Sequence, residues 1–343
     1  MICVFDDIQR RHAPSHFIVA GRPQPIPERP ERVDMLLSGV ARLGLPVVAP
    51  DPVAPAALTT VHTPRYLDFL STLLERWRHI PNASDYPAPN VFAMGRPGLA
   101  PVSYPDGVVG QVGWHMGDGS CPMMDETLAA ALASASTALH GAGLVMQGER
   151  QVYALCRPPG HHASSDMAAG FCYFNNAALA AEALTRAGRR AAILDIDVHH
   201  GNGTEAIFYD RADVLTVSLH CDPLRFYPFF WGHAGERGAG EGEGFNLNLP
   251  LPRGTGIAAY LAALDGALRR ISDFSADVLV VATGLDTAVD DPFQAFTIAT
   301  PEFAALGRAI AALKRPTLWV QEGGYPSASL GPNLASLLGG ALA

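Results

Sequence analysis

Charged residues are scarce in this chain. They make up 17% of its 343 residues, whereas hydrophobic residues make up 48%. This balance excludes an intrinsically disordered chain and allows a large buried core. The formal net charge is -9, which disfavours binding to nucleic acid or to an anionic membrane surface, because both are polyanions. We therefore expect neither nucleic acid nor membrane as a partner.

The cysteines are too few and too irregularly spaced for a disulfide framework or a zinc ribbon. They are Cys3, Cys121, Cys156, Cys172 and Cys221. The chain start has no positively charged stretch followed by an apolar run, so it does not resemble a signal peptide. We also expect no membrane span, because no run of about 18 apolar residues stands out. These features predict a cytoplasmic protein.

Short apolar runs alternate with helical patterns in the second half of the chain. The runs predict buried strands at residues 152–156, 191–196, 214–219, 278–282 and 317–320. Continuous apolar strands suit a parallel sheet that is covered on both faces. Helices are expected at 176–187, ending before Gly188, at 257–271, and at 301–313, with Thr300 as the N-cap. The sequence thus predicts a single doubly wound α/β domain over residues 1–343, with a mostly parallel sheet flanked by helices.

A proline-rich segment, residues 81–110, interrupts this pattern. It contains Pro81, Pro87, Pro89, Pro97, Pro101 and Pro105. A loop of this length in a compact domain is usually functional. We interpret it as an ordered insertion near the site or at an oligomer interface, with a mobile surface loop as the alternative.

Polar clusters directly follow all five expected strands. They lie at residues 157–162, 197–203, 220–223, 284–286 and 321–325. Ligands of open α/β sheets bind beyond the carboxyl ends of the strands. The clusters are therefore expected to meet in one crevice.

The cluster at 195–199 predicts a metal site. Asp195, Asp197 and His199 alternate along the strand end, which places them on one side while the strand stays extended. Asp197, His199 and Asp286 provide two carboxylates and one imidazole, a set that suits a divalent ion such as zinc with positions left open for water and substrate. Asp195 would then orient a nearby histidine. A buried Asp/His cluster that only satisfies local backbone is the alternative, and the length of the motif disfavours it.

Two further groups are candidates for proton transfer and oxyanion binding. His161 and His162 follow a tight Pro-Pro-Gly turn, on which both rings can line one wall and pair through their second nitrogens. Tyr325 follows two glycines, and its phenol can donate to a developing oxyanion. Taken alone, Tyr325 would equally be a packed core tyrosine.

Together these motifs resemble the histone deacetylase superfamily, which has the arginase–deacetylase fold. The matching segments are RPPGHH at 157–162, GFCYFNNAA at 170–178, LDIDVHHGNG at 194–203, the region of Asp286, and EGGY at 322–325. They occur in the order that the family has. The resemblance implies a zinc-dependent amidohydrolase that removes acetyl groups from amines.

The resemblance also implies roles for individual residues. His162 acts as general base and then as general acid, and His161 assists electrostatically. Asp195 hydrogen-bonds His161, and Asn202 is the partner of His162. Tyr325 polarises the amide carbonyl.

The remaining implied residues bind ions and the substrate chain. Asp197, His199 and Asp286 would hold one zinc ion. An apolar tunnel for the alkyl stem of the substrate would be lined by Gly170, Phe171, Tyr227 and Phe293. The family's monovalent-cation site, which takes potassium, is matched by Asp195, Asp197, His199, Ser218 and Leu219.

Asn202 and Glu322 make the chain similar to class II deacetylases and bacterial acetylpolyamine amidohydrolases. The latter dimerise and narrow their entrance through an insertion like residues 81–110. We therefore expect a homodimer that acts on small acetylated amines, most specifically acetylpolyamines. One departure is that Val109 and Ser120 replace acidic residues that hold the distal ammonium group of the substrate, although Asp106 and Asp118 lie nearby.

Other functions remain open from the sequence. A protein or peptide acetyl-lysine deacetylase, or a hydrolase of another small acetylamide, would use the same machinery. A two-manganese ureohydrolase shares the fold but needs a further Asp-rich motif. A non-catalytic acetyl-amine-binding protein would be expected to lack a metal ligand or the tyrosine.

Overall fold

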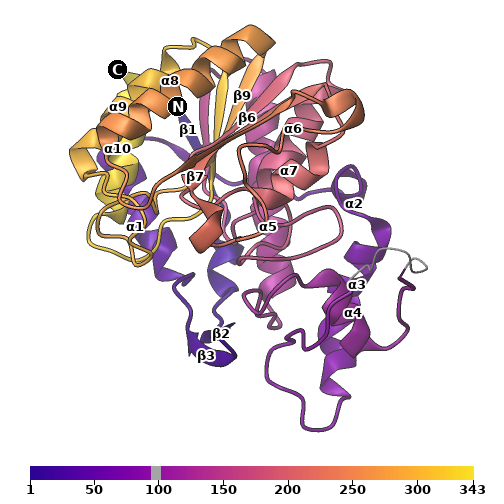
Figure 1. Cartoon of the computed structure of the whole chain (residues 1–343). Helices are drawn as coiled ribbons and strands as arrows, with labels where there is room; N and C mark the ends of the chain where they lie inside the picture. Colours follow the sequence, from indigo (N-terminus) through magenta and orange to yellow (C-terminus); the bar gives the residue numbers. More distant parts are fainter. Residues whose placement is uncertain (94–101) are drawn as a thin grey trace.

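An eight-stranded sheet forms the centre of the structure, a computed structural model that describes residues 1–93 and 102–343 (Figure 1). Its strand order is β4-β1-β5-β10-β9-β6-β7-β8, and every pairing described in it is parallel. The strands are β1 (Ile2–Val4), β4 (Val47–Val48), β5 (Gln151–Ala154), β6 (Ala191–Asp195), β7 (Val214–Cys221), β8 (Asn246–Leu251), β9 (Val278–Thr283) and β10 (Thr317–Gln321). The predicted parallel sheet is therefore present.

The strands that the apolar runs predict lie side by side in the order β5-β10-β9-β6-β7. Strands β1, β4 and β8 complete the two edges and are not evident from the sequence. Two of them are very short, and β8 alternates asparagine with leucine in the sequence NLNLPL. An edge strand lacks the continuous apolar signal because it is not fully enclosed.

Helices cover both faces of the sheet (Figure 1). One face carries α5 (Thr127–Met146) and α6 (Asn176–Arg186), and the other carries α1 (Glu31–Arg42), α8 (Ile257–Phe274), α9 (Phe303–Ala311) and α10 (Leu330–Leu342). The alternation of side chains along a strand separates the two cores. Val152 and Ala154 belong to the first, and Tyr153 belongs to the second.

One predicted helix differs from the observed one. The segment expected at 301–313 begins as a 3-10 turn, η4 (Thr300–Glu302), and continues as α9. Its N-cap is Ala299 rather than Thr300, and the Glu302 carboxylate accepts the N–H of Ala299 at 2.7 Å. The reach of this side chain back to residue 299 satisfies a free amide without a hydroxyl cap.

Helix α5 is long and apolar enough to cross a membrane by length and composition, contrary to the expectation that no such run is present. Of its most apolar 18-residue window, 61% is buried inside the structure. It packs against α6, β5 and the 3-10 helix η1 (Asp7–Arg11). Its apolar surface is therefore used in the core of the fold.

Smaller elements complete the fold. The hairpin of β2 (His16–Val19) and β3 (Arg22–Pro25) projects below the sheet in Figure 1. The others are α2 (Pro55–Leu58), α3 (Pro64–Arg78), α4 (Val108–His115), α7 (Asn202–Phe208), η2 (Pro223–Arg225) and η3 (Gly240–Gly242). Of the proline-rich segment, Pro97 and Pro101 lie outside the described residues, and the segment leads into α4, which packs on α3.

His62, just before α3, should make the fold sensitive to acid. Its Nε2 accepts the N–H of Asn175 at 3.0 Å, and burial lowers the pKa of His62 to about 4. An unfolded histidine titrates near pH 6.5, so between about pH 6.5 and 4 the unfolded chain binds the extra proton. The free energy of unfolding should fall there by about 1.4 kcal/mol per pH unit for this group.

Melting temperatures measured from pH 7 to 4 test this expectation. In His62→Gln the amide oxygen can accept the same N–H. The decline of stability towards acid pH should be shallower than in the wild type, by the amount that corresponds to the uptake of about one proton. His79→Gln, at an exposed position after α3, is the matched control and should retain the wild-type slope. Equal slopes for His62→Gln and the wild type would contradict the prediction.

Candidate active site

The turn after β6 positions the candidate metal ligands. Strand β6 ends at Asp195, so Asp197 and His199 lie in the turn beyond it, and the expected extended alternation is wrong. The carboxylates themselves shape this turn. Asp195 Oδ1 accepts the N–H of Asp197 at 3.0 Å, and Asp197 Oδ1 accepts the N–H of His199 at 2.9 Å.

Asp197, His199 and Asp286 come together as a candidate metal centre. His199 Nδ1 lies 3.1 Å from Asp197 Oδ1 and 3.1 Å from Asp286 Oδ2. One atom of each residue lies within 4.8 Å of the others, and all three side chains are buried. Two carboxylates and one imidazole suit a divalent ion with open coordination positions. The residues present therefore fit such an ion.

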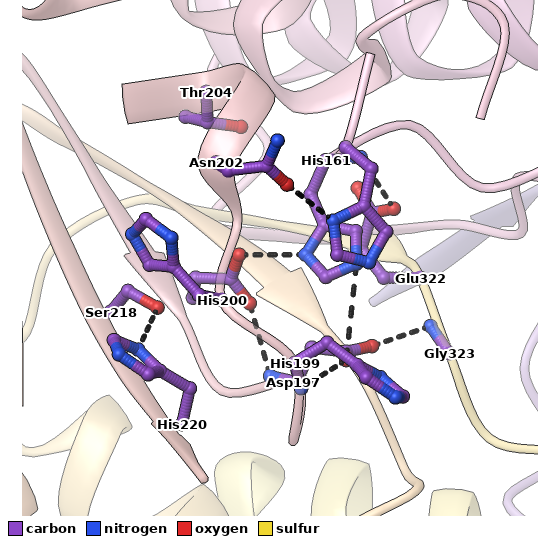
Figure 2. A network of polar contacts seen from close by, with 12 residues as sticks. His161, Asp197, His199, His200, Asn202, Thr204, Ser218, His220, Glu322 and Gly323 are labelled. Atoms are coloured by element: carbon purple, nitrogen blue, oxygen red, sulfur yellow. Dashed lines mark hydrogen bonds and ion pairs between the residues drawn. The ribbon is translucent and has the colours of Figure 1, made fainter. Parts of the chain in front are cut away.

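Backbone amides and a glycine hold the two carboxylates in place. Gly323 N–H donates to Asp197 Oδ2 at 2.7 Å (Figure 2). Val198 N–H donates to Asp286 Oδ1 at 2.9 Å. A Cβ atom at position 323 would collide with both carboxylates. Glycine is therefore required at position 323 of the EGGY motif, because the backbone there lies against the metal centre.

The adjacent histidines face this centre with different partners. His161 Nδ1 lies 2.9 Å from Asp195 Oδ2, and His162 Nδ1 lies 2.7 Å from Asn202 Oδ1. The two ring centroids are 4.0 Å apart. Both predicted pairings are therefore present in the geometry. With Nδ1 donating to the amide oxygen, His162 keeps a lone pair on Nε2.

Their surroundings shift the two histidines in opposite directions. Burial lowers the pKa of His161, but the carboxylates of Asp197 and Asp195 outweigh burial and raise it to about 10. Burial lowers the pKa of His162 well below its usual value, and the neighbouring charges of His161 and His199 lower it further. The carboxylates thus favour the protonated form of His161, whereas burial favours the neutral form of His162.

Glu322 fixes the turn that carries the histidine pair. Its Oε2 accepts the N–H groups of Gly160 at 2.6 Å and His161 at 3.0 Å (Figure 2). Burial raises the pKa of this carboxyl to about 7. His161, Cys172 and Glu322 also lie close enough to share a metal. Glu322 already binds the turn and His161 already pairs with Asp195. We therefore interpret the group of His161, Cys172 and Glu322 as structural and not as a metal site.

Tyr325 lies in an aromatic environment at the base of the site. Its N–H donates to Asp291 Oδ2 at 2.9 Å. Its ring centroid lies 5.0 Å from that of Phe293 and 5.9 Å from that of Phe171, in edge-on arrangements. The Arg32 guanidinium lies 5.0 Å from the ring centroid. These contacts hold the ring in place, and Tyr325 lines the same cavity as His162 and His199.

Arg32 is a supporting residue that the sequence motifs do not reveal. It donates to the carbonyls of Gly324 at 2.6 Å and Glu322 at 2.5 Å, and thus holds the loop that carries Tyr325. Glu28 compensates its charge at 2.7 Å and also pairs with Arg157 at 2.9 Å. All of these charges are buried. Their partners are remote in sequence, so no local pattern indicates the network.

A cavity of about 530 Å³ leads from the surface to these groups. All four residues predicted for the tunnel line it, namely Gly170, Phe171, Tyr227 and Phe293, and His162, His199 and Tyr325 line it as well. Phe17 from the β2–β3 hairpin and the run Phe229, Phe230 and Trp231 also line it, although no motif predicted them. Three consecutive aromatic residues in a loop were the available signal for that run.

Of the two acidic residues Asp106 and Asp118, only Asp118 lines the tunnel cavity. Tyr227 Oη donates to Asp118 Oδ2 at 2.6 Å, and Asp118 and Ser120 both line the cavity. Within the described parts of residues 81–110, neither Asp106 nor Val109 nor any other residue lines it. The geometry of this chain therefore does not support a role for Asp106 in holding the distal ammonium group of the substrate.

Part of the predicted monovalent-cation group surrounds a small internal space. Asp195 and Ser218 are paired across β6 and β7 and line a void of about 10 Å³. This is about the size that one small bound species needs. Ser218 Oγ also contacts His220 Nδ1 at 2.8 Å, while Leu219 is the next residue of β7 (Figure 2).

Comparisons with known proteins agree over nearly the whole chain. The sequence model of the histone deacetylase domain matches residues 26–340. An acetylpolyamine amidohydrolase of Burkholderia pseudomallei is 44% identical over 341 residues, covering 99% of this chain and 98% of that protein. Acetylpolyamine amidohydrolase 2 of Pseudomonas aeruginosa is 40% identical, with 99% and 98% covered. A crystal structure of the acetylpolyamine aminohydrolase from Burkholderia pseudomallei superimposes with a TM-score of 0.94 at 44% identity, covering 99% of this chain and 98% of that one. The arginase–deacetylase fold is thus confirmed.

Proposed function

Because this chain belongs to the histone deacetylase family, we propose that it hydrolyses the acetyl amide bond of acetylated polyamines with one zinc ion. The observation that carries the proposal is one arrangement of side chains. The buried Asp197, His199 and Asp286 lie close to His162, and His162 and His199 line the same aromatic-walled cavity. That set of groups can activate water and bind a developing oxyanion.

Asp197, His199 and Asp286 would hold the zinc ion, which would supply Lewis-acid chemistry for the acetyl carbonyl and the attacking water. His162 accepts the proton of the attacking water at Nε2, because burial lowers its pKa and favours the neutral ring. Asn202 holds the ring through Nδ1 and adds no charge. His162 then returns the proton to the departing amine nitrogen.

Tyr325 and His161 stabilise charge during the reaction. The Tyr325 hydroxyl, whose ring is fixed by Phe171 and Phe293, donates a hydrogen bond to the developing oxyanion. The Asp195 carboxylate at His161 Nδ1 favours the protonated form of His161, which would place a positive charge next to His162. The tunnel residues enclose the alkyl stem and keep bulk water away from the reacting bond.

Three features support an acetylpolyamine rather than an acetylated protein as the substrate. The relatives named for acetylpolyamines match this chain from end to end. The aromatic-lined cavity suits an alkyl chain. The net charge of -9 draws cations towards the protein.

Acetate release from a set of substrates tests the proposal. Acetylputrescine, acetylcadaverine, acetylspermidine and an acetyl-lysine peptide should be compared side by side on the zinc-loaded enzyme. We expect kcat/KM for the acetylated polyamines to exceed that for the peptide by about tenfold or more, or about 1.4 kcal/mol in the transition state. Preference for the peptide would contradict the choice of substrate, and no acetate from any of them would contradict the deacetylase proposal.

Further parts of the proposal concern the whole molecule. Residues 1–343 form one deacetylase domain, and residues 81–110 contribute to a homodimer interface. The void beside Asp195 and Ser218 suits potassium. The five cysteines are buried and unpaired, which supports a location in the reducing cytoplasm.

A further inference from the structure

A second pocket, of about 400 Å³, lies beside the tunnel cavity. The two share His162, Met167, Ala169, Asn202 and Trp231 as lining residues, so they adjoin along one wall. The remaining wall of the second pocket comes mainly from α7 and the residue after it, through Glu205, Ala206 and Tyr209, and from Glu236 in the loop between β7 and β8. None of these four residues has a role in the proposed chemistry.

Two carboxylates converge in this pocket. Asn248 Nδ2 donates to Glu205 Oε2 at 2.7 Å and to Glu236 Oε2 at 3.2 Å. Glu205 is 6% exposed, and its other contacts, with Asn246 and His200, also use Oε2. Among the described residues, the Oε1 atom of neither glutamate has a hydrogen-bond donor. Each glutamate therefore keeps one oxygen, Oε1, that can accept a hydrogen bond from an ammonium group in the pocket.

The same pocket offers aromatic surface to such a cation. Trp231 is 54% exposed and Tyr209 is half-buried, and both line the pocket. Phe229 and Phe230 continue the exposed aromatic run towards the tunnel cavity, where they are lining residues. An ammonium group binds favourably over the face of an indole ring, and methylene groups pack against exposed aromatic surface.

We propose that the pocket formed by Glu205, Glu236 and Trp231 binds the distal ammonium group of long acetylpolyamines. This inference rests on the proposed function. The acetyl end of such a substrate occupies the tunnel cavity, and its chain continues past Trp231 into the second pocket. The pocket would therefore favour a substrate with an additional aminopropyl group over an acetylated diamine.

Ala206 provides a matched pair of variants for the test. It is exposed, follows Glu205 on α7 and lines the pocket. Ala206→Lys adds a competing ammonium, whereas Ala206→Gln adds a side chain of comparable length without charge. The substrates are N8-acetylspermidine and acetylputrescine, which share the acetylaminobutyl end and differ by an aminopropyl group. Their ratio of kcat/KM is the measured quantity.

We expect Ala206→Lys to lower this ratio about tenfold, through KM for N8-acetylspermidine, and Ala206→Gln to stay within about twofold of wild type. Glu236→Gln should lower the ratio in the same way. Its amide oxygen can still accept the N–H groups of Gly232 and His233, which now bind Glu236 Oε2 at 2.6 and 2.9 Å. An unchanged ratio in Ala206→Lys and Glu236→Gln would overturn the inference.

Calorimetric binding of free spermidine separates this inference from the proposed function. Ala206→Lys should weaken the binding by about tenfold and Ala206→Gln should not. Binding that is sensitive to the lysine in an enzyme without acetate release would refute the proposed function and support the pocket. Equal spermidine binding in both variants and wild type would refute the pocket, whatever the rate of acetate release.

Discussion

Removal of the divalent ion is expected to abolish acetate release from acetylputrescine, and added zinc is expected to restore it. The reason is the donor set: Asp197, His199 and Asp286 are buried, with their ligand atoms within 4.8 Å of one another. In Asp286→Ala two ligands remain, too few for the three that a catalytic zinc site uses. We expect about 10⁴-fold or greater loss of kcat/KM, since several kcal/mol of transition-state stabilisation depend on the ion.

Metal content and acetate release should be measured together. The matched control is Asp290→Ala, because Asp290 is exposed and accepts a hydrogen bond from Ser329 Oγ, away from the ligand set. This variant should retain one metal per chain and wild-type rates. Full activity after exhaustive chelation, or normal zinc content in Asp286→Ala, would show that the assigned ligands are wrong.

Tyr325→Phe should lower kcat by about 10² to 10³, as for the loss of one oxyanion donor. The substitution removes one hydroxyl and keeps the ring, so the contacts with Phe171 and Phe293 remain. Because the hydrogen bond strengthens as the oxyanion forms, KM should change much less than kcat. Steady-state rates on acetylputrescine measure both quantities.

Tyr227→Phe removes a different hydroxyl from the same cavity and is the control for this experiment. The Tyr227 hydroxyl donates to Asp118, not to the reacting group. Its loss should leave kcat within about threefold of wild type, since neutral hydrogen bonds contribute about 0.5–1.5 kcal/mol to structure. Similar losses of kcat in the two variants would contradict the role of Tyr325 as an oxyanion donor.

Much of the site is predictable because parallel strands end at one edge of a sheet. The clusters that begin at Arg157, Asp197, Gly284 and Gln321 each follow an apolar run, and β5, β10, β9 and β6 place them side by side. The sequence therefore predicts the convergence of these residues. The pairing of His161 with Asp195 and of His162 with Asn202 is implied by the resemblance to the family, and the structure has both contacts. The detailed path of the turn at Asp197 is not predictable, because the carboxylates of Asp195 and Asp197 each accept a backbone N–H from two residues further along the chain.

The supporting network and the second pocket depend on contacts between segments remote in sequence. Arg32 holds the carbonyls of Glu322 and Gly324, and neither its position nor its neighbours distinguish it from a surface arginine in the sequence. Glu205 and Glu236 look like ordinary exposed acids until β8 brings Asn248 between them.

By itself, the sequence determined the parallel α/β architecture, the family and the groups that surround the metal centre, because hydrophobic periodicity and local motifs fix which residues follow each strand. The tertiary structure alone decided which buried charges compensate one another, which loops wall the tunnel and where a second cation pocket adjoins it. Those features depend on loop paths and side-chain directions, which are set by packing between distant segments and leave no periodic trace in the chain.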